Sequence, residues 1–255
     1  MKNRFSIGII FVLIILLIGV FGCMMNNPDL SNKTETEVSL NDRQKSILAE
    51  YGLPTEYDEL LLSQKKAIVA IEEMLCYAEE KYERSFSYAG YIAASPLEKE
   101  HMIAFPTSGN KWSDSFTITN NGDSYEDDYI NVAINEEFAS YLCVNIKSFA
   151  HDAEVRVFPK ITKTYFFELP SGDINYEGMV ESSQCVFIDE STFNEEDLSK
   201  FHEQFTEFMQ EHKLYGITQI ILLKEGRIEY LTKYNYTDYL FDEHHISRET
   251  FYTKK

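Results

Sequence analysis

Residues 86–120 read FSYAGYIAASPLEKEHMIAFPTSGNKWSDSFTITN, three apolar runs separated by residues typical of turns. The runs begin at Phe86, His101 and Ser115, and the breaks between them contain SP and TSGN. A short apolar run bounded by turn residues predicts a β-strand, and the apolar-polar alternation is clearest in the third run. We therefore predict three consecutive strands without a helix between them, which favours antiparallel pairing.

Two helices are predicted before these strands. The first covers residues 41–51, because SLND at 39–42 has the form of a capping box and GLP at 52–54 favours an end. The second covers residues 64–81, with Ser63 as its N-cap. Helical spacing predicts a buried face formed by Ile68, Ile71, Leu75, Ala78 and Tyr82. It predicts an opposite charged face formed by Lys65, Lys66, Glu72, Glu73, Glu79 and Glu80.

Helices and strands continue in groups after the acidic run YEDDY. Two amphipathic helices are predicted over residues 135–149 and 194–213, with apolar faces formed by Phe138, Leu142, Ile146 and Phe149, and by Leu198, Phe201, Phe205, Phe208 and Met209. The predicted strands are EVRVFPKI at 154–161, QCVFID at 184–189, ITQIILL at 217–223 and RIEYLTKY at 227–234. The last two form a predicted hairpin through the turn KEG.

The amino terminus predicts membrane targeting. MKNR carries two cations and precedes 18 mostly apolar residues, FSIGIIFVLIILLIGVFG, which end directly before Cys23. A helix of this length spans the hydrocarbon layer of a bilayer. A charged start, an apolar run and a small residue are also the pattern of a secretory signal. The residues alone leave an uncleaved membrane helix and a cleaved signal open.

Val20-Phe21-Gly22-Cys23 resembles the lipobox of bacterial lipoproteins. The aliphatic residue, the glycine and the cysteine match that pattern, whereas Phe21 stands where a small residue is usual. The resemblance implies that the Cys23 thiol receives a diacylglyceryl group and that residues 1–22 are removed. Two acyl chains anchor a protein stably, so membrane lipid is the implied partner of Cys23. The implied location is the extracytoplasmic face of the cell membrane.

These patterns together predict an α+β fold, with a largely antiparallel sheet and helices packed against it. We expect a signal peptide at 1–22, a flexible spacer at 23–38 and an ectodomain at 39–255, with a possible subdivision near 160–176. The length remaining after Cys23 is sufficient to bury a substantial core.

The chain is strongly acidic. It carries 42 Asp and Glu residues against 23 Lys and Arg residues, a formal net charge of −19, or −21 without Lys2 and Arg4. A phosphate backbone requires a basic patch, and the sequence has none longer than a pair of lysines, so nucleic acid is excluded as a partner. The acidity indicates either simple solubility or attraction of cations and basic ligands.

The body of the chain contains Cys76, Cys143 and Cys185, an odd number without CxxC spacing. This pattern indicates neither a disulfide framework nor a thiolate metal site, although one oxidised pair remains open. We expect all three to be small core residues.

Two histidine motifs resemble metal sites incompletely. His202-Glu203-Gln204-Phe205-Thr206 differs from HExxH because Thr206 replaces the second ligand, and His212 lies on a different part of the helix surface. His244 and His245 are adjacent, so in an extended chain they point in opposite directions. We expect solvated helix and tail residues here.

The best cation candidates are Glu98, Glu100, Asp127 and Asp128, two acidic pairs beside predicted elements. If the pairs meet at one end of the sheet, their oxygens would suit calcium or magnesium. The alternative is that acids before a helix complement its dipole.

No cofactor motif is present: GxSxG, Walker A and GxGxxG are all missing from the sequence. The sequence favours a membrane-anchored, non-catalytic ectodomain that binds an unknown protein or small molecule. An extracytoplasmic enzyme, assembled from distant residues and dependent on a divalent cation, is the alternative.

Overall fold

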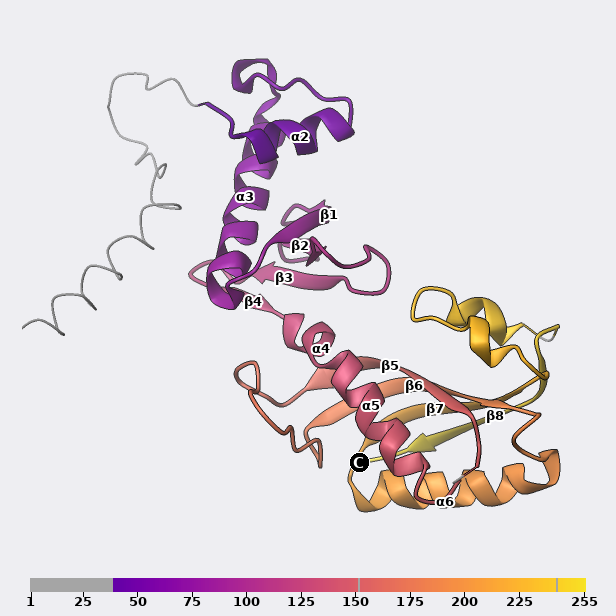
Figure 1. Ribbon diagram of the computed structural model, residues 1–255. Coiled ribbons are helices and arrows are strands. Elements are labelled where there is room, and N and C mark those ends of the chain that lie inside the picture. The colour runs from indigo at the N-terminus through magenta and orange to yellow at the C-terminus, as the bar shows by residue number, and fades with distance from the viewer. Residues whose placement is uncertain (1–38, 151, 242) are drawn as a thin grey trace, which may run out of the picture. The chain divides into compact units, whose positions relative to one another are not determined.

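The computed structural model describes residues 39–150, 152–241 and 243–255 (Figure 1). The predicted signal peptide, lipid-bearing Cys23 and spacer lie outside the described residues. The described chain divides into two compact units, residues 39–81 and Tyr82–Lys255. The predicted subdivision near 160–176 stays a prediction. None of the described helices is long and apolar enough to cross a membrane.

The first unit is helical. It contains α2, Asp42–Glu50, the 3₁₀ turn η1, Tyr57–Glu59, and α3, Leu62–Tyr82, whose last residue enters the second unit. A small core joins these elements through the buried side chains of Leu40, Leu48, Leu60 and Ile68. Both predicted helices are therefore confirmed.

The two predicted helix caps are wrong. Asn41 is the N-cap of α2: its side chain accepts a hydrogen bond from Gln44 N–H at 2.8 Å, and the Gln44 side chain accepts one from Asn41 N–H at 2.9 Å. This is a capping box displaced from the predicted motif. Ser63 lies inside the first turn of α3, where Gln64 Oε1 accepts from Leu61 N–H at 2.8 Å.

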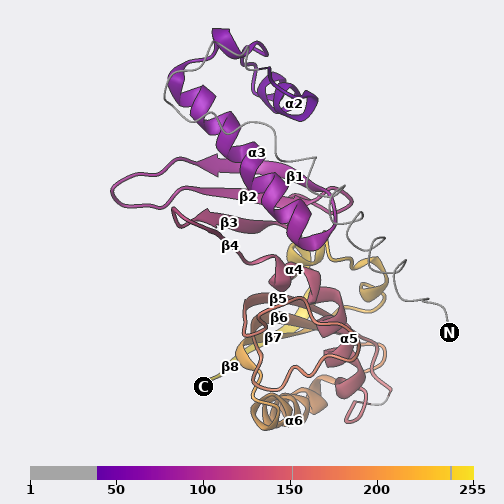
Figure 2. The ribbon, with the colours of Figure 1, turned by 90° about the vertical axis from the view of Figure 1, so that its left-hand side faces the viewer.

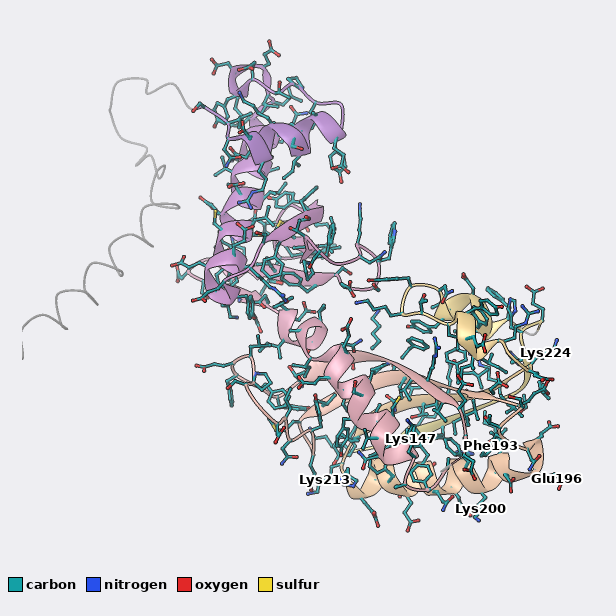
Figure 3. The ribbon with its side chains drawn as sticks, in the orientation of Figure 1. Lys147, Phe193, Glu196, Lys200, Lys213 and Lys224 are labelled. Atoms are coloured by element: carbon teal, nitrogen blue, oxygen red, sulfur yellow. The ribbon has the colours of Figure 1, made fainter. Side chains whose placement is uncertain are left out.

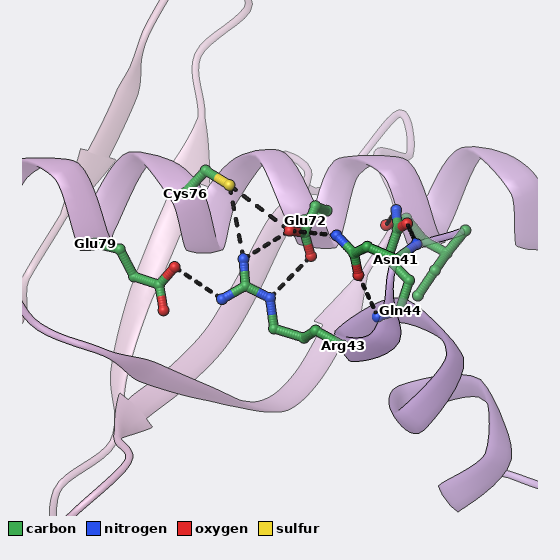
Figure 4. A network of polar contacts seen from close by, with 7 residues as sticks. Asn41, Arg43, Gln44, Glu72, Cys76 and Glu79 are labelled. Carbon is green, nitrogen blue, oxygen red and sulfur yellow. Dashed lines mark hydrogen bonds and ion pairs between the residues drawn. The ribbon is translucent and has the colours of Figure 1, made fainter. Parts of the chain in front are cut away.

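An ion-pair network joins α2 to α3 (Figure 4). Arg43 donates to both carboxylate oxygens of Glu72, at 2.9 and 2.7 Å, and to Glu79 at 2.8 Å. Burial opposes the charge of Arg43, but the two carboxylates raise its pKa. The sequence places Glu72 and Glu79 on the charged face of α3, opposite the apolar one, yet their side chains are only 19% and 27% exposed because they bind Arg43.

The second unit begins with an antiparallel sheet, called the first sheet. Its order is β1-β2-β3-β4: β1, Phe86–Ile92; β2, His101–Pro106; β3, Phe116–Asn120; β4, Tyr125–Asp127. The three predicted strands and their antiparallel pairing are confirmed. The acidic run contributes a short fourth strand that the sequence pattern did not predict. Phe86, Phe116 and Tyr129 pack their rings at about 5 Å beside this sheet.

Two helices and a second sheet follow. The helices are α4, Tyr129–Ala133, and α5, Asn135–Ile146. The second sheet has the order β5-β6-β7-β8: β5, Val155–Thr164; β6, Val180–Asp189; β7, Tyr215–Leu223; β8, His245–Thr253. Its β6 and β7 are parallel and are connected by the turn η2, Glu195–Asp197, and by α6, Leu198–Glu211. The remaining pairs are antiparallel, so the predicted α+β class is confirmed.

The predicted hairpin at 217–234 is wrong. The segment after β7 instead forms two 3₁₀ turns, η3 at Ile228–Tyr230 and η4 at Tyr236–Leu240, before β8 pairs with β7. We call residues 228–240 the cover segment, because Ile228 and Leu231 are buried against one face of the second sheet. Figures 1 and 2 show α6 on the opposite face.

Each face of the second sheet has its own core. Alternate residues of one strand point to opposite faces, so Ile220 and Leu222 of β7 pack with α5 and α6, whereas Ile221 and Leu223 pack beneath the cover segment. Both predicted apolar helix faces are buried, except that Phe149 is only half-buried.

Candidate ligand-binding groove

An apolar groove lies between α5, the edge strand β5 and the start of the cover segment. Its volume is about 390 Å³, and its lining is Ala139, Ser140, Cys143, Val144, Val155, Arg156, Val157, Phe158 and Leu231. Apolar atoms dominate this lining, and Val144 is 70% exposed. A concave apolar surface with a few polar groups is the usual form of a small-molecule site.

The amino end of α5 holds the helix against the edge of β5. Asn135 Nδ2 donates to the carbonyl of Pro159 at 2.9 Å, and Asn135 Oδ1 accepts from Ile161 N–H at 3.3 Å. One side-chain amide therefore takes the place of a neighbouring strand at this point. Covering an edge strand in this way blocks unwanted pairing with other chains. The groove lies further along α5, between residues 139–144 of the helix and residues 155–158 of β5.

The Cys143 thiol lies in this groove. Burial raises its pKa, while a hydrogen bond from Val157 N–H and the charge of Lys147 act in the opposite direction. Lys147 follows the carboxyl end of α5 (Figure 3). The net rise favours the protonated thiol, which is a poor nucleophile. Cys143 therefore contributes a small, weakly polar surface to the groove.

Arg156 brings the only formal charge to the groove lining. Its Nη1 donates to the carbonyl of Leu231, the residue that follows η3. Among the residues that the structure describes, no carboxylate forms an ion pair with Arg156. Arg43 in the first unit contrasts with it, because Arg43 binds two carboxylates.

A second arginine holds the other end of the cover segment. Arg248 of β8 donates to the Leu240 carbonyl at 3.3 Å and to Gln219 at 2.8 Å. Between these ends, Tyr236 stacks on Phe158 with the ring centroids 4.9 Å apart. The cover segment is thus anchored at both ends and packed in its middle, which gives the groove a fixed wall.

The structure does not bring the four candidate metal ligands together. Glu98 and Glu100 line a separate polar groove of about 510 Å³ beside the β1–β2 loop, whereas Asp127 and Asp128 do not line it. Across the described part of the chain, no group of three or more His, Cys, Asp or Glu side chains could hold a metal ion.

Each of these four acids has a partner within the protein. Glu100 accepts from the Tyr91 hydroxyl and from Asn120 Nδ2. Asp127 accepts from the Tyr82 hydroxyl at 2.7 Å and from the main-chain N–H of Tyr129 at 3.1 Å, in the first turn of α4. The latter contact agrees with the helix-dipole alternative. Asp128 accepts from Thr117 N–H at 2.6 Å, and Glu98 Oε1 lies 3.9 Å from His101 Nε2.

Burial raises the pKa of Asp128, the N–H groups of Thr117 and of Asp128 itself lower it, and the neighbouring Asp127 raises it again. The net direction is upward, and burial is its largest cause.

His202 has a structural role. Its Nδ1 lies 2.7 Å from Glu249 Oε2, and its ring stacks on Phe251 with centroids 4.7 Å apart, so it joins α6 to β8. His212 lies 3.4 Å from the Tyr141 hydroxyl instead of beside His202. His244 lies 3.2 Å from the carboxylate of its neighbour Glu243.

Within the described residues, Cys76, Cys143 and Cys185 form no disulfide with one another, and each is half-buried, whereas the sequence predicted core residues. Cys143 packs at the margin of the core under α5 and α6, and Cys185 at the margin of the core beneath the cover segment. Burial raises the pKa of Cys185 to about 11, against the lowering effect of Arg248. Cys76 lies 3.6 Å from an Arg43 nitrogen in the network of Figure 4.

Sequence reasoning missed the groove, although one signal was present. In EVRVFPKI, Arg156 interrupts an apolar strand, and a charge at such a position requires a reason. The remaining lining comes from α5 and from Leu231, which the sequence pattern placed in a strand. The chain matches no protein family, no curated protein and no solved structure.

Proposed function

We propose that this chain is a lipid-anchored, extracytoplasmic binding protein without catalytic activity, and that the groove between α5 and β5 is its ligand site. The observation that carries this proposal is the combination, in one groove, of an apolar lining and the Arg156 guanidinium. An apolar wall supplies affinity through burial, and a single polar group supplies orientation.

The position of Val144 supports binding at this groove. Its side chain is 70% exposed although it borders an apolar surface. Covering such a side chain removes apolar area from water, at roughly 25 cal/mol for each Å². A ligand that fits the groove would gain this contribution without any rearrangement of the sheet.

The ligand test uses full-length protein and 4-phenylbutyrate as a probe with an apolar body. Saturable amide shifts at Val144, Val155 and Leu231 in two-dimensional NMR are expected. Val144→Asp should abolish them, because a charge would be buried by the bound probe. Leu62→Asp is the matched control, since Leu62 is 71% exposed and lies on α3. Shifts spread over the whole surface, or unchanged in Val144→Asp, would refute the groove as the site.

The membrane anchor is tested separately. The lipobox resemblance places the lipid on the Cys23 thiol, so Cys23→Ser should prevent metabolic labelling with palmitate and leave residues 1–22 attached. Cys76→Ser is the control, because that thiol is half-buried in the folded unit. A wild-type protein that takes up no lipid and retains residues 1–22 would favour the uncleaved membrane helix instead.

The polar groove beside the β1–β2 loop favours the alternative, a cation-dependent extracytoplasmic enzyme. Glu98 and Glu100 both line it. Glu100, however, is already engaged by Tyr91 and Asn120, which leaves Glu98 as the more available carboxylate. A divalent cation needs several oxygen ligands, and here one of the two carboxylates already accepts hydrogen bonds from the protein. We therefore place the cation-dependent enzyme second.

A further inference from the structure

We infer that the ligand of the groove between α5 and β5 carries a carboxylate, which pairs with Arg156. This inference rests on the proposed function, because it assumes that the groove binds a ligand. It adds a chemical class: a molecule with an apolar body and one carboxylate.

The first argument is charge. The chain has 42 acidic and 23 basic residues, so a cation usually finds an acid nearby. Several do so in the second unit: Lys213 lies 2.9 Å from Glu177, and Lys233 pairs with Glu136. Arg156 is half-buried, and within the described residues it has no carboxylate partner. A partly desolvated charge without a counterion is unfavourable, and a ligand can supply the missing anion.

The second argument is hydrogen bonding. A guanidinium carries five N–H donors in a planar fork that fits both oxygens of a carboxylate. Within the described chain, the bond to the Leu231 carbonyl is the single hydrogen bond that the Arg156 side chain makes. The carbonyl fixes the side chain against the wall of the groove, and donors remain for a ligand. The chain thus holds the guanidinium in place without neutralising it.

The third argument is the lining. Val144, Val155 and Leu231 surround Arg156 with apolar surface. A small inorganic anion would leave this surface exposed, whereas an aliphatic or aromatic body would cover it. The volume of about 390 Å³ suits a small molecule. The same carboxylate chemistry could come from a free acid or from a polypeptide carboxyl terminus.

Arg156 could instead serve only to anchor the cover segment. Arg248 provides the comparison, because it also donates to a carbonyl of that segment, at Leu240. Arg248 does not line the groove. Loss of either arginine removes one anchor, but only loss of Arg156 removes the charge that a ligand would meet. Arg248→Gln is therefore the matched control for Arg156→Gln.

The experiment compares two probes of nearly equal shape, 4-phenylbutyrate and 4-phenylbutanamide, by NMR titration of full-length protein at constant ionic strength. The wild type and Arg248→Gln should bind the acid at least about tenfold more tightly than the amide. Arg156→Gln should bind the two equally. Arg156→Lys keeps the charge but not the fork and should show a smaller preference. If Arg156→Gln fails to fold, Arg156→Lys takes its place in the comparison of acid and amide.

Equal binding of acid and amide by the wild type would overturn the inference while leaving the groove as a binding site. A preference that survives in Arg156→Gln would overturn it as well. No saturable binding of either probe would overturn the proposed function itself. A dipeptide acid and its amide, acetyl-Phe-Leu in both forms, identify the source: tighter binding of the peptide acid than of 4-phenylbutyrate assigns the carboxylate to a polypeptide terminus.

Discussion

Asp189 Oδ2 accepts a hydrogen bond from Gly226 N–H at 3.0 Å, although the two residues are 37 positions apart. The other carboxylate oxygen accepts from the main-chain N–H and the hydroxyl of Ser191, at 2.9 and 2.6 Å. Asp189 is fully buried at the end of β6, and Gly226 follows the end of β7. One carboxylate thus joins the loops that leave the two parallel strands.

Asp189→Ala should lower the free energy of unfolding by about 3 kcal/mol, because it removes a fully buried carboxylate and leaves the partly buried main-chain donors of Ser191 and Gly226 without their acceptor. Glu190→Ala is the matched control: this neighbouring acid accepts from Glu225 N–H at 2.8 Å but is exposed, so its loss should cost less than about 1 kcal/mol. Urea denaturation measures both. Equal losses would mean that the buried carboxylate does not hold the two loops.

Gly216→Ala should destabilise the protein by about 3 kcal/mol. Gly216 is paired with Ser182 near the start of the parallel β6–β7 ladder, at φ +137°, and a Cβ there would overlap the carbonyl oxygen of Ser182. Gly226→Ala provides the comparison, since Gly226 has φ +71° but open space around its Cα. Its left-handed backbone alone should cost about 1–2 kcal/mol. A smaller loss at Gly216 than at Gly226, by thermal denaturation, would contradict the close strand approach.

Tyr176→Phe should leave the free energy of unfolding unchanged or raise it by about 1 kcal/mol. Tyr176 is 3% exposed, and its hydroxyl has no hydrogen-bond partner among the described residues. Removing the hydroxyl therefore removes a buried polar group without breaking a described bond. A loss of several kcal/mol would reveal a partner for the hydroxyl.

Tyr176 should also contribute to alkaline unfolding. Burial raises its pKa to about 12, with smaller contributions from Glu137 and Tyr141, against about 10 in an unfolded chain. A raised pKa gives stability that is complete below pH 10 and is lost as the pH rises toward 12. Tyr176→Phe should reduce the fall in stability over this window, while Tyr252→Phe, at an exposed position, should not. An identical fall in wild type and Tyr176→Phe would exclude Tyr176 as a source.

The periodicity of apolar residues predicted most elements because helices and strands bury faces of different period. It failed at 227–234, where Ile228 of the 3₁₀ turn η3 and Leu231, the residue after this turn, are buried against the second sheet. Two apolar residues three positions apart are compatible with a 3₁₀ turn and also with an interrupted strand. The local sequence does not distinguish these two structures, and packing against β7 determines which one forms. The groove could not be predicted from the sequence either, because its walls come from three segments, α5, β5 and the cover segment, that only the tertiary fold brings together.

Leu75→Ala should lower the free energy of unfolding by about 2–5 kcal/mol, since Leu75 is fully buried. The sequence pattern placed Glu72 on the charged face opposite the buried one, where a change would do little. The structure indicates otherwise, so Glu72→Gln should cost about 1–3 kcal/mol by breaking the paired contact with Arg43. Glu80→Gln, at an exposed position of the same helix, should cost less than about 0.5 kcal/mol. A Glu72→Gln protein as stable as Glu80→Gln would mean that the contact with Arg43 adds nothing to stability, as the sequence pattern predicted for this face.

Divalent cations should stabilise the protein no more than sodium chloride does at equal ionic strength. The carboxylates of Asp127 and Asp128 already accept hydrogen bonds from Tyr82 and Thr117. A cation would have to compete with these donors, whereas screening of a net charge of −19 requires no site. Melting temperatures in calcium, magnesium and sodium chloride measure the difference.

The variant for this test is Glu98→Gln, because Glu98 is exposed and Asp127→Asn would disturb the Tyr82 contact whether or not a cation binds. Ion-specific binding stabilises the native state by mass action. In that case the rise in melting temperature should saturate with the concentration of the cation and disappear in Glu98→Gln. Stabilisation by screening should persist in Glu98→Gln, because the loss of one charge among 42 acidic residues changes the electrostatic field of the protein little. We expect the second result. A saturable calcium or magnesium effect that Glu98→Gln abolishes would instead move the polar groove, and the cation-dependent enzyme, ahead of the binding protein.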